Sequence, residues 1–228
     1  VTLTKSNGSP ADVPQPDAVV SLNSRVIESH FFAETIDALC PSPGMPLFFK
    51  RLVNNDSVYY PYLGPLGTGW WHNFNMWLDE YTDGRIEFHT GTGISRFFES
   101  SSGGTYKPSP GDYGVLTRDP DGTFQLKEKD GFIYRFRPNL NLDYMQDLNG
   151  NKISAIYDSS NHLTEVRHSG GKSLYLTYNS AGRITKLTDH AGRVTTYEYD
   201  ATNLLLVKVT DPVGGVTGYT YGVGPSDI

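Results

Sequence analysis

Three tryptophans and two carboxylates lie close together between positions 70 and 80, and these residue types could form a binding site. They are Trp70, Trp71, Trp77, Asp79 and Glu80. Aromatic rings stack on the C–H faces of sugars and carboxylates bind hydroxyl groups, so the segment would suit a carbohydrate. Paired carboxylates are also the minimum for glycoside hydrolysis. We favour a structural interpretation, because tryptophans in a strand-rich chain usually fill a core. We expect Trp70 and at least one of Trp71 and Trp77 to be packed under a sheet.

Other catalytic motifs are weak in this sequence. The single cysteine, Cys40, cannot form an internal disulfide, and no cysteines and histidines have zinc-ligand spacing. The glycines at 64–69 do not open a helix after a strand, as a phosphate-binding loop requires. Asp147, Asp189 and Asp211 precede turn glycines, where aspartate caps the backbone, with calcium binding as the alternative. We therefore predict no enzymatic activity, no cofactor and no metal site.

Composition and charge indicate a β-rich chain and argue against several classes of protein. The 228 residues include 24 glycines, 14 prolines and 15 tyrosines, which is typical of short strands joined by tight turns. Nineteen basic residues against 25 acidic ones give a net charge of −6, so the chain has no basic field for nucleic acid. The longest apolar run, at 204–207, is far shorter than the roughly 20 residues of a membrane-spanning helix.

An internal repeat in the C-terminal half indicates the secondary structure of this chain. Four tyrosines are separated by 21, 21 and 22 residues, and a glycine stands seven residues before each. A degenerate fifth copy begins at Phe136. We assign structural roles to the repeat positions Gly150, Tyr157, Asp158, Gly171, Tyr178, Gly182, Arg183, Gly192, Tyr199, Asp200, Gly214 and Tyr221.

Each period of the repeat contains two short alternating runs and two turns, which predicts one β-hairpin. A hairpin cannot bury its face alone, so consecutive units must pair edge to edge. We therefore predict an all-β fold in which antiparallel hairpin repeats form one long curved sheet over residues 126–228. The four tyrosines should occupy equivalent positions in it. The last strand, Gly214 to Tyr221, should present an open edge that promotes self-association.

Two groups of motifs resemble the Rhs family of YD-repeat proteins. The segment 171–185, with Tyr178-Asn179 followed by Gly182-Arg183, resembles the YD repeat. Residues 43–55 and 66–73 resemble the region that precedes Rhs repeats, with Val53 in place of the usual tyrosine. The resemblance covers residues 30–228. The family includes bacterial polymorphic toxins, the C component of insecticidal toxin complexes and the teneurins.

The resemblance implies a non-catalytic segment of a YD-repeat shell that encloses a C-terminal toxin or effector. Its partners would be the rest of its own shell and that cargo, and the location would be secreted or at the cell surface. The aspartate pair that self-cleaves the toxin in the family lies in a later motif and has no counterpart here. Two alternatives remain: a cell-surface carbohydrate-binding or adhesion module that binds a surface glycan, and a β-sheet glycosidase or lyase that uses Asp79 and Glu80.

Three regions follow from these patterns. Residues 1–16 are expected to be a flexible lead-in, 17–125 a β-rich region before the repeats, and 126–228 about five repeat copies. Within the second region, Phe31 to Leu39 is predicted to be a strand. Ser100 to Gly114 is rich in glycine, serine and proline, and is predicted to be a long exposed loop.

Overall fold

The fold is nearly all β, as the sequence predicts. The computed structural model describes residues 3–4, 6–8, 19–20, 32–54 and 62–221. Within them the structure consists of strands and tight turns, with one short 3₁₀ turn at Ser102–Gly104. The strands form one large sheet and three small ones.

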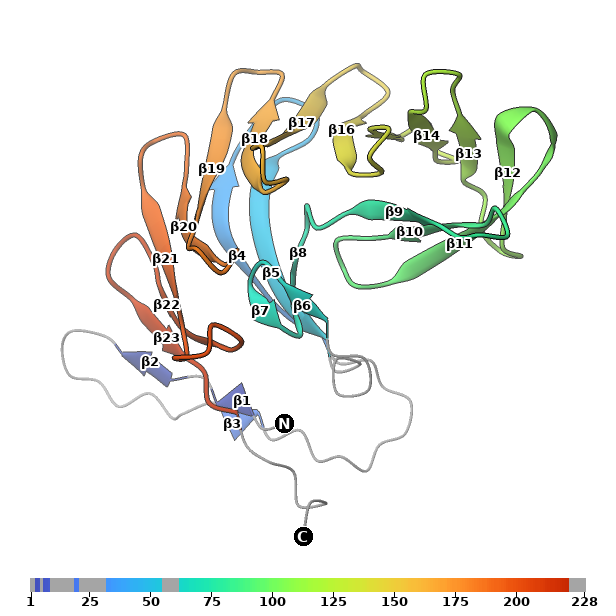
Figure 1. The fold of residues 1–228 in the computed structure, drawn as a ribbon. Helices are drawn as coiled ribbons and strands as arrows, with labels where there is room; N and C mark the ends of the chain where they lie inside the picture. Colours follow the sequence, from blue (N-terminus) through green and yellow to red (C-terminus); the bar gives the residue numbers. More distant parts are fainter. Residues whose placement is uncertain (1–2, 5, 9–18, 21–31, 55–61, 222–228) are drawn as a thin grey trace, which may run out of the picture.

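The large sheet is antiparallel throughout and bends into an arch (Figure 1). Its strands follow the sequence from β9 to β23, and β2 (Ser6–Gly8) is added beyond β23. The first seven are β9 (Trp77–Glu80), β10 (Ile86–His89), β11 (Ser95–Ser100), β12 (Thr105–Pro108), β13 (Val115–Arg118), β14 (Phe124–Lys127) and β15 (Ile133–Phe136). The repeat region contributes β16 (Leu142–Gln146), β17 (Lys152–Tyr157), β18 (Leu163–His168), β19 (Ser173–Tyr178), β20 (Ile184–Thr188), β21 (Val194–Tyr199), β22 (Leu206–Thr210) and β23 (Val216–Gly218). The predicted sheet is therefore continuous, and it starts well before residue 126.

Turns between repeat strands are built by the residue that follows the tyrosine. The Asp158 side chain accepts the backbone N–H groups of Ser160 and His162, each at 2.9 Å. The fourth residue of this turn, Asn161, has a φ of 67°, a left-handed conformation that asparagine tolerates and glycine prefers. This side-chain cap explains why aspartate or asparagine recurs at that position of the repeat.

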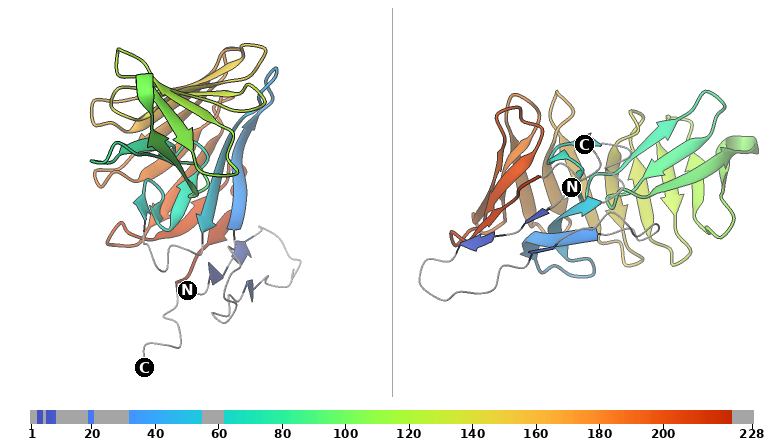
Figure 2. Two further views of the ribbon diagram at one scale, coloured as in Figure 1. Left: turned by 90° about the vertical axis from the view of Figure 1, so that its right-hand side faces the viewer. Right: turned by 90° about the horizontal axis from the view of Figure 1, so that it is seen from below.

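A three-stranded sheet lies on the concave side of the arch. It has the order β4 (Phe32–Cys40), β5 (Leu47–Asn54), β8 (Trp70–His72), and its strands run beneath β17 to β20 (Figures 1 and 2). The two-stranded sheets are β6 (Leu63–Gly64) with β7 (Gly67–Thr68) and β1 (Leu3–Thr4) with β3 (Val19–Val20). Phe49 of β5 and Leu187 of β20 belong to one hydrophobic core. The two sheets therefore bury their apolar faces against each other.

At its β9 end the large sheet curls back toward its own middle. The Leu78 N–H donates to the carbonyl of Leu140 at 2.9 Å, and Trp77 forms a bridge with Asn141. The Phe88 ring of β10 contacts Phe136 of β15 edge-on, with centroids 5.3 Å apart. The β15–β16 turn thus covers the edge of β9, which would otherwise be an unpaired strand.

The predicted open edge at the other end of the sheet is wrong. The last strand is Val216–Gly218, shorter than the predicted Gly214 to Tyr221, and Ser6–Gly8 pairs with it in antiparallel register. Any extended segment that reaches the edge of a sheet can form hydrogen bonds with its unpaired backbone groups. Here that segment comes from the region predicted to be a flexible lead-in, so β23 is covered and the described sheet ends instead at the three-residue strand β2.

Two predictions for the N-terminal half have opposite outcomes. The strand predicted from Phe31 to Leu39 is confirmed as Phe32–Cys40, although Phe31 itself lies outside the described residues. The loop predicted from Ser100 to Gly114 is wrong, because it contains the strand Thr105–Pro108. Tyr106 in this strand is only 9% exposed and lies 5.9 Å, ring to ring, from Phe124. The strand was not predicted because the alternation of exposed and buried residues at Thr105, Tyr106 and Lys107 is short and is flanked by glycine, serine and proline.

Candidate functional site

A buried ion pair lies where the three-stranded sheet meets the repeats. The Arg51 Nε donates to both carboxylate oxygens of Asp37, at 2.9 and 3.1 Å. Their side chains are 3% and 4% exposed. Because an isolated buried charge is very costly, each residue needs the other. We call this pair and its repeat partners the joint.

The repeats supply three further groups to the joint. The Tyr197 hydroxyl donates to the Asp37 carboxylate at 2.8 Å, and the Thr195 hydroxyl donates to the Asp37 backbone carbonyl at 3.3 Å. Arg51 also donates to the hydroxyl of Tyr219. Burial and the nearby Asp37 charge hold the pKa of Tyr197 well above its usual value, so its hydroxyl keeps its proton and donates. The pKa of Arg51 is raised as well, since Asp37 and Tyr219 outweigh the lowering effect of burial.

Trp70 completes the joint. It is 3% exposed, and its ring meets that of Tyr219 edge-on with centroids 4.8 Å apart. Its Nε1 donates to the Tyr221 hydroxyl at 2.9 Å, while the Arg51 guanidinium lies 5.5 Å from the ring centroid. A tryptophan in these surroundings holds two sheets together, so its indole face is not offered to a ligand.

The repeat tyrosines form a ladder along the same face of the sheet. Tyr157, Tyr178 and Tyr199 end β17, β19 and β21, and each follows a shift in strand register. From Tyr178 onward each hydroxyl donates to the carbonyl of the residue 15 positions earlier, which begins the preceding strand. These bonds are Tyr178 to Leu163 at 3.0 Å, Tyr199 to Ile184 at 2.7 Å and Tyr221 to Leu206 at 2.7 Å. Spacing and strand position together explain why a tyrosine recurs in every copy.

The loop between β6 and β7 is attached to this ladder. The Pro65 carbonyl accepts the Ile184 N–H at 2.8 Å and the Tyr199 hydroxyl at 3.3 Å. The Thr68 N–H donates to the carbonyl of Leu204 at 2.7 Å. The segment that precedes the repeats therefore contacts two successive copies through backbone groups, which holds it in place over a wide area.

Cys40 also connects the two sheets. It is fully buried, and its Sγ lies 2.9 Å from Nδ1 of His190 in the β20–β21 turn. Burial raises the pKa of the Cys40 thiol, which keeps it protonated and unreactive.

Asp189 accepts backbone N–H groups of Ala191 and Arg193, each at 2.9 Å. The Asp189 carboxylate thus caps the turn, which is the role predicted from its place before a turn glycine.

Three of the five candidate ligand-binding residues, Trp71, Trp77 and Asp79, lie together, whereas Trp70 and Glu80 do not join them. Trp71 is 8% exposed and stacks on Tyr62 and on Trp77, at centroid distances of 3.9 and 5.8 Å. Trp77 also stacks on His89 at 4.3 Å, and its Nε1 donates to Asp79 at 3.3 Å. Asp79 lies 2.9 Å from the His89 ring, whereas Glu80 pairs with Arg118 at 2.9 Å. The two acids therefore do not face each other as a glycosidase pair would. The proposed sugar platform also loses Trp70 and Trp71 to the core.

Sequence reasoning missed Glu87 and His89, which lie beside Asp79. The register of β9 and β10 places Glu87 directly opposite Asp79, and His89 directly opposite Trp77. The hairpin turn at Asp83-Gly84 could have revealed them, because it fixes which residues of the two flanking strands lie opposite each other.

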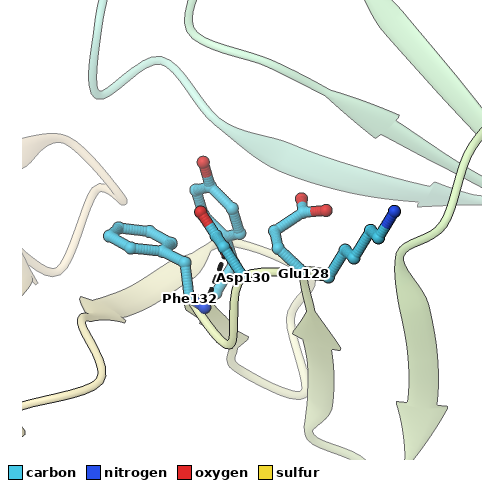
Figure 3. Close-up of a pocket in the computed structure, with 5 residues that line it drawn as sticks. Glu128, Asp130 and Phe132 are labelled. Atoms are coloured by element: carbon cyan, nitrogen blue, oxygen red, sulfur yellow. Dashed lines mark hydrogen bonds between the residues drawn. The ribbon is translucent and has the colours of Figure 1, made fainter.

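A shallow hollow of about 730 Å³ lies at the β14–β15 turn. It is lined by Glu128, Lys129, Asp130, Phe132 and Tyr134 (Figure 3). Asp130 accepts the Phe132 N–H at 3.0 Å, and Glu128 binds Arg96. Both carboxylates are thus engaged by the protein, and the hollow offers no convergent pair of acids.

In the part of the chain that the structure describes, no helix has the length and apolar character needed to cross a bilayer.

Comparison with known proteins agrees with this architecture. The family described as RHS Repeat matches residues 157–189 and 178–216, which contain Tyr157, Tyr178 and Tyr199 of the tyrosine ladder. A domain of unknown function, DUF6531, matches residues 29–98, which contain the three-stranded sheet. The chain is an Rhs/YD-repeat protein.

One relative is double-stranded DNA deaminase toxin A of Burkholderia cenocepacia (strain H111). The two are 30% identical over an alignment of 202 residues, and the match covers 82% of this chain and 14% of the toxin. The chain thus spans about one seventh of the length of that relative.

Proposed function

We propose that this chain is the capped end of an Rhs shell that encloses a C-terminal toxin. The observation that carries the proposal is the joint, which fixes the three-stranded sheet inside the concave face of the repeats. An arched sheet encloses a volume only if its ends are closed. The curl of β9 to β11 against β14 and β15 provides one closure, and the three-stranded sheet fills the concave side beneath β17 to β20.

The role in this proposal is structural and needs no catalytic group from the chain. The ladder tyrosines and the turn-capping aspartates hydrogen-bond to backbone groups, and the charges of the joint pair with each other. Polar side chains that are bonded to the protein in this way make the sheet more rigid. The same reasoning disfavours the glycan-binding alternative, because Trp70 and Trp71 are buried.

The relative is a DNA deaminase toxin, which supports a toxin as the cargo. Since the matched region is 14% of that toxin, deaminase activity would belong to another part of such a protein. We propose that this chain acts outside the cell that makes it, secreted or on its surface, as a container for a toxin delivered to a target.

Limited proteolysis of the full-length protein tests the proposal. We expect the C-terminal segment to resist protease in the wild type and to become sensitive in Arg51→Met, which breaks the joint. The matched control is Arg167→Met, since Arg167 pairs with Glu165 on the surface and is 58% exposed. A C-terminal segment that is cleaved readily in the folded wild-type protein would contradict enclosure. So would protection that is unchanged in Arg51→Met once loss of the joint has been verified.

A further inference from the structure

A histidine and two carboxylates face one another on β9 and β10. Asp79 and Glu87 are direct cross-strand partners, and the Nε2 of His89 lies 2.9 Å from Asp79 Oδ2 and 3.6 Å from Glu87 Oε1. One donor atom from each residue falls within 4.8 Å of the others. The Asp79 side chain is 55% exposed, whereas those of Glu87 and His89 are 11% and 17% exposed. The group is therefore open to solvent on one side.

Two like charges directly opposite each other in a sheet are destabilising unless something positive lies between them. The described structure places the His89 ring, and no lysine or arginine bond, at the facing oxygens of this pair. A cation at that point would offset the repulsion between the two carboxylates.

Neighbouring groups orient all three side chains. The Trp77 Nε1 donates to Asp79 at 3.3 Å, and the Tyr81 hydroxyl donates to the second oxygen of Glu87 at 2.5 Å. The Ser95 hydroxyl, which also bonds Glu87, lies 3.4 Å from the His89 Nδ1. When the Ser95 hydroxyl proton is directed to Glu87, the Ser95 oxygen accepts a hydrogen bond from the Nδ1–H of His89. In this tautomer the Nε2 lone pair faces the carboxylate oxygens, where one cation could be bound by all three side chains.

We propose that Asp79, Glu87 and His89 bind a first-row divalent transition metal ion, with Zn²⁺ as the probe. Zinc bonds of about 2.0–2.2 Å to nitrogen and oxygen place the ligand atoms about 3.4 Å apart in a tetrahedral site. The observed separations of 2.9 and 3.6 Å bracket that value. Water would complete the coordination on the exposed side. An imidazole with two carboxylates suits such metals better than Mg²⁺ or Ca²⁺, which prefer oxygen ligands alone.

Bound metal would fasten the first strand of the large sheet to the second. This inference is independent of the enclosed toxin, because it concerns only β9 and β10.

Titration calorimetry of the tag-free chain with Zn²⁺ at neutral pH tests it. We expect one ion per chain, and binding weakened at least tenfold in both Asp79→Asn and His89→Ala. The matched control is His162→Ala, since His162 faces a single carboxylate, Asp158, at 3.3 Å. This variant should bind Zn²⁺ as the wild type does. Circular dichroism without metal checks that each variant is folded.

A second readout uses the Trp77 ring, whose centroid lies 4.3 Å from that of His89. Cu²⁺ should quench tryptophan fluorescence saturably in the wild type, and Trp77→Phe should lose most of that quenching. Absence of saturable Zn²⁺ binding by the wild type at millimolar concentration would overturn the proposal. Binding that survives in both site variants, or is lost in His162→Ala, would overturn it as well.

Discussion

Acid should destabilise this protein through one buried histidine, His72 of β8. It is 2% exposed, its ring stacks on Phe49 with centroids 5.0 Å apart, and its Nδ1 accepts the Phe74 N–H at 3.3 Å. Burial disfavours the charged imidazole and lowers the pKa of His72 from 6.5 to about 3. Above pH 6.5 the histidine is neutral in both the folded and unfolded states, and it imposes no penalty.

The penalty grows as the pH falls from 6.5 toward 3. In this window the unfolded chain binds a proton at this position and the folded chain does not, so the free energy of unfolding falls by about 1.4 kcal/mol per pH unit. Between pH 6.5 and 4.5 the loss is about 2.3 kcal/mol, because the unfolded histidine is already half protonated at pH 6.5. It levels off near pH 3, where the folded protein takes up the proton too.

Urea unfolding of the wild type and of His72→Phe across this range measures the effect. Phenylalanine keeps the ring and removes the titration, while carboxylates that titrate in both proteins cancel in the difference. We expect the difference in unfolding free energy to shift by about 2.3 kcal/mol in favour of the variant between pH 6.5 and 4.5. Substitution of the more exposed His162 is the control. A difference that does not change with pH would refute the reasoning that His72 is buried and neutral.

Four further results are expected. Arg51→Met should lower the free energy of unfolding by about 3–5 kcal/mol in urea titrations because it leaves Asp37 charged in the core, and a loss of only a few tenths would contradict a buried joint. Tyr199→Phe should cost about 1 kcal/mol for the bond to Ile184, and no measurable change would mean that the ladder adds nothing to stability. Gly192→Ala should cost about 1 kcal/mol from strain alone, since φ is 79° and the new methyl group meets no atom within 4 Å; a stabilised variant would contradict the left-handed turn. Deletion of residues 1–16 should expose β23 and cause association with increasing concentration in sedimentation, which a strictly monomeric deletion variant would exclude.

The repeat was predictable because each of its features is local. A turn fixes the spacing between strands, and a tyrosine every 21 or 22 residues always returns to the same end of a strand. The bonds from Tyr178 and Tyr199 span 15 residues, and the caps by Asp158 span four. Short-range rules of this kind are sufficient to derive a hairpin array from sequence.

The joint could not be predicted in the same way. Arg51 meets Tyr219 across 168 positions, and Tyr197 meets Asp37 across 160. No periodicity connects such residues, because their proximity results from folding one sheet into the curve of another. The pairing of β2 with β23 is of the same long-range type. The division of the candidate sugar-binding residues has the same cause, because Trp70 is held by Tyr219 and Tyr221 of the last repeat, whereas Trp71 and Trp77 stack on each other.

Electron cryomicroscopy of the full-length protein would show whether this chain is the capped end of a shell around a toxin. We expect residues 32–54 to lie inside the concave face with Arg51 against Asp37 and Tyr219. We also expect further hairpins to continue from the repeat sheet and enclose density for the C-terminal segment. A map in which the repeats form an open sheet, with the C-terminal segment outside it, would rule out enclosure of a toxin by this fold.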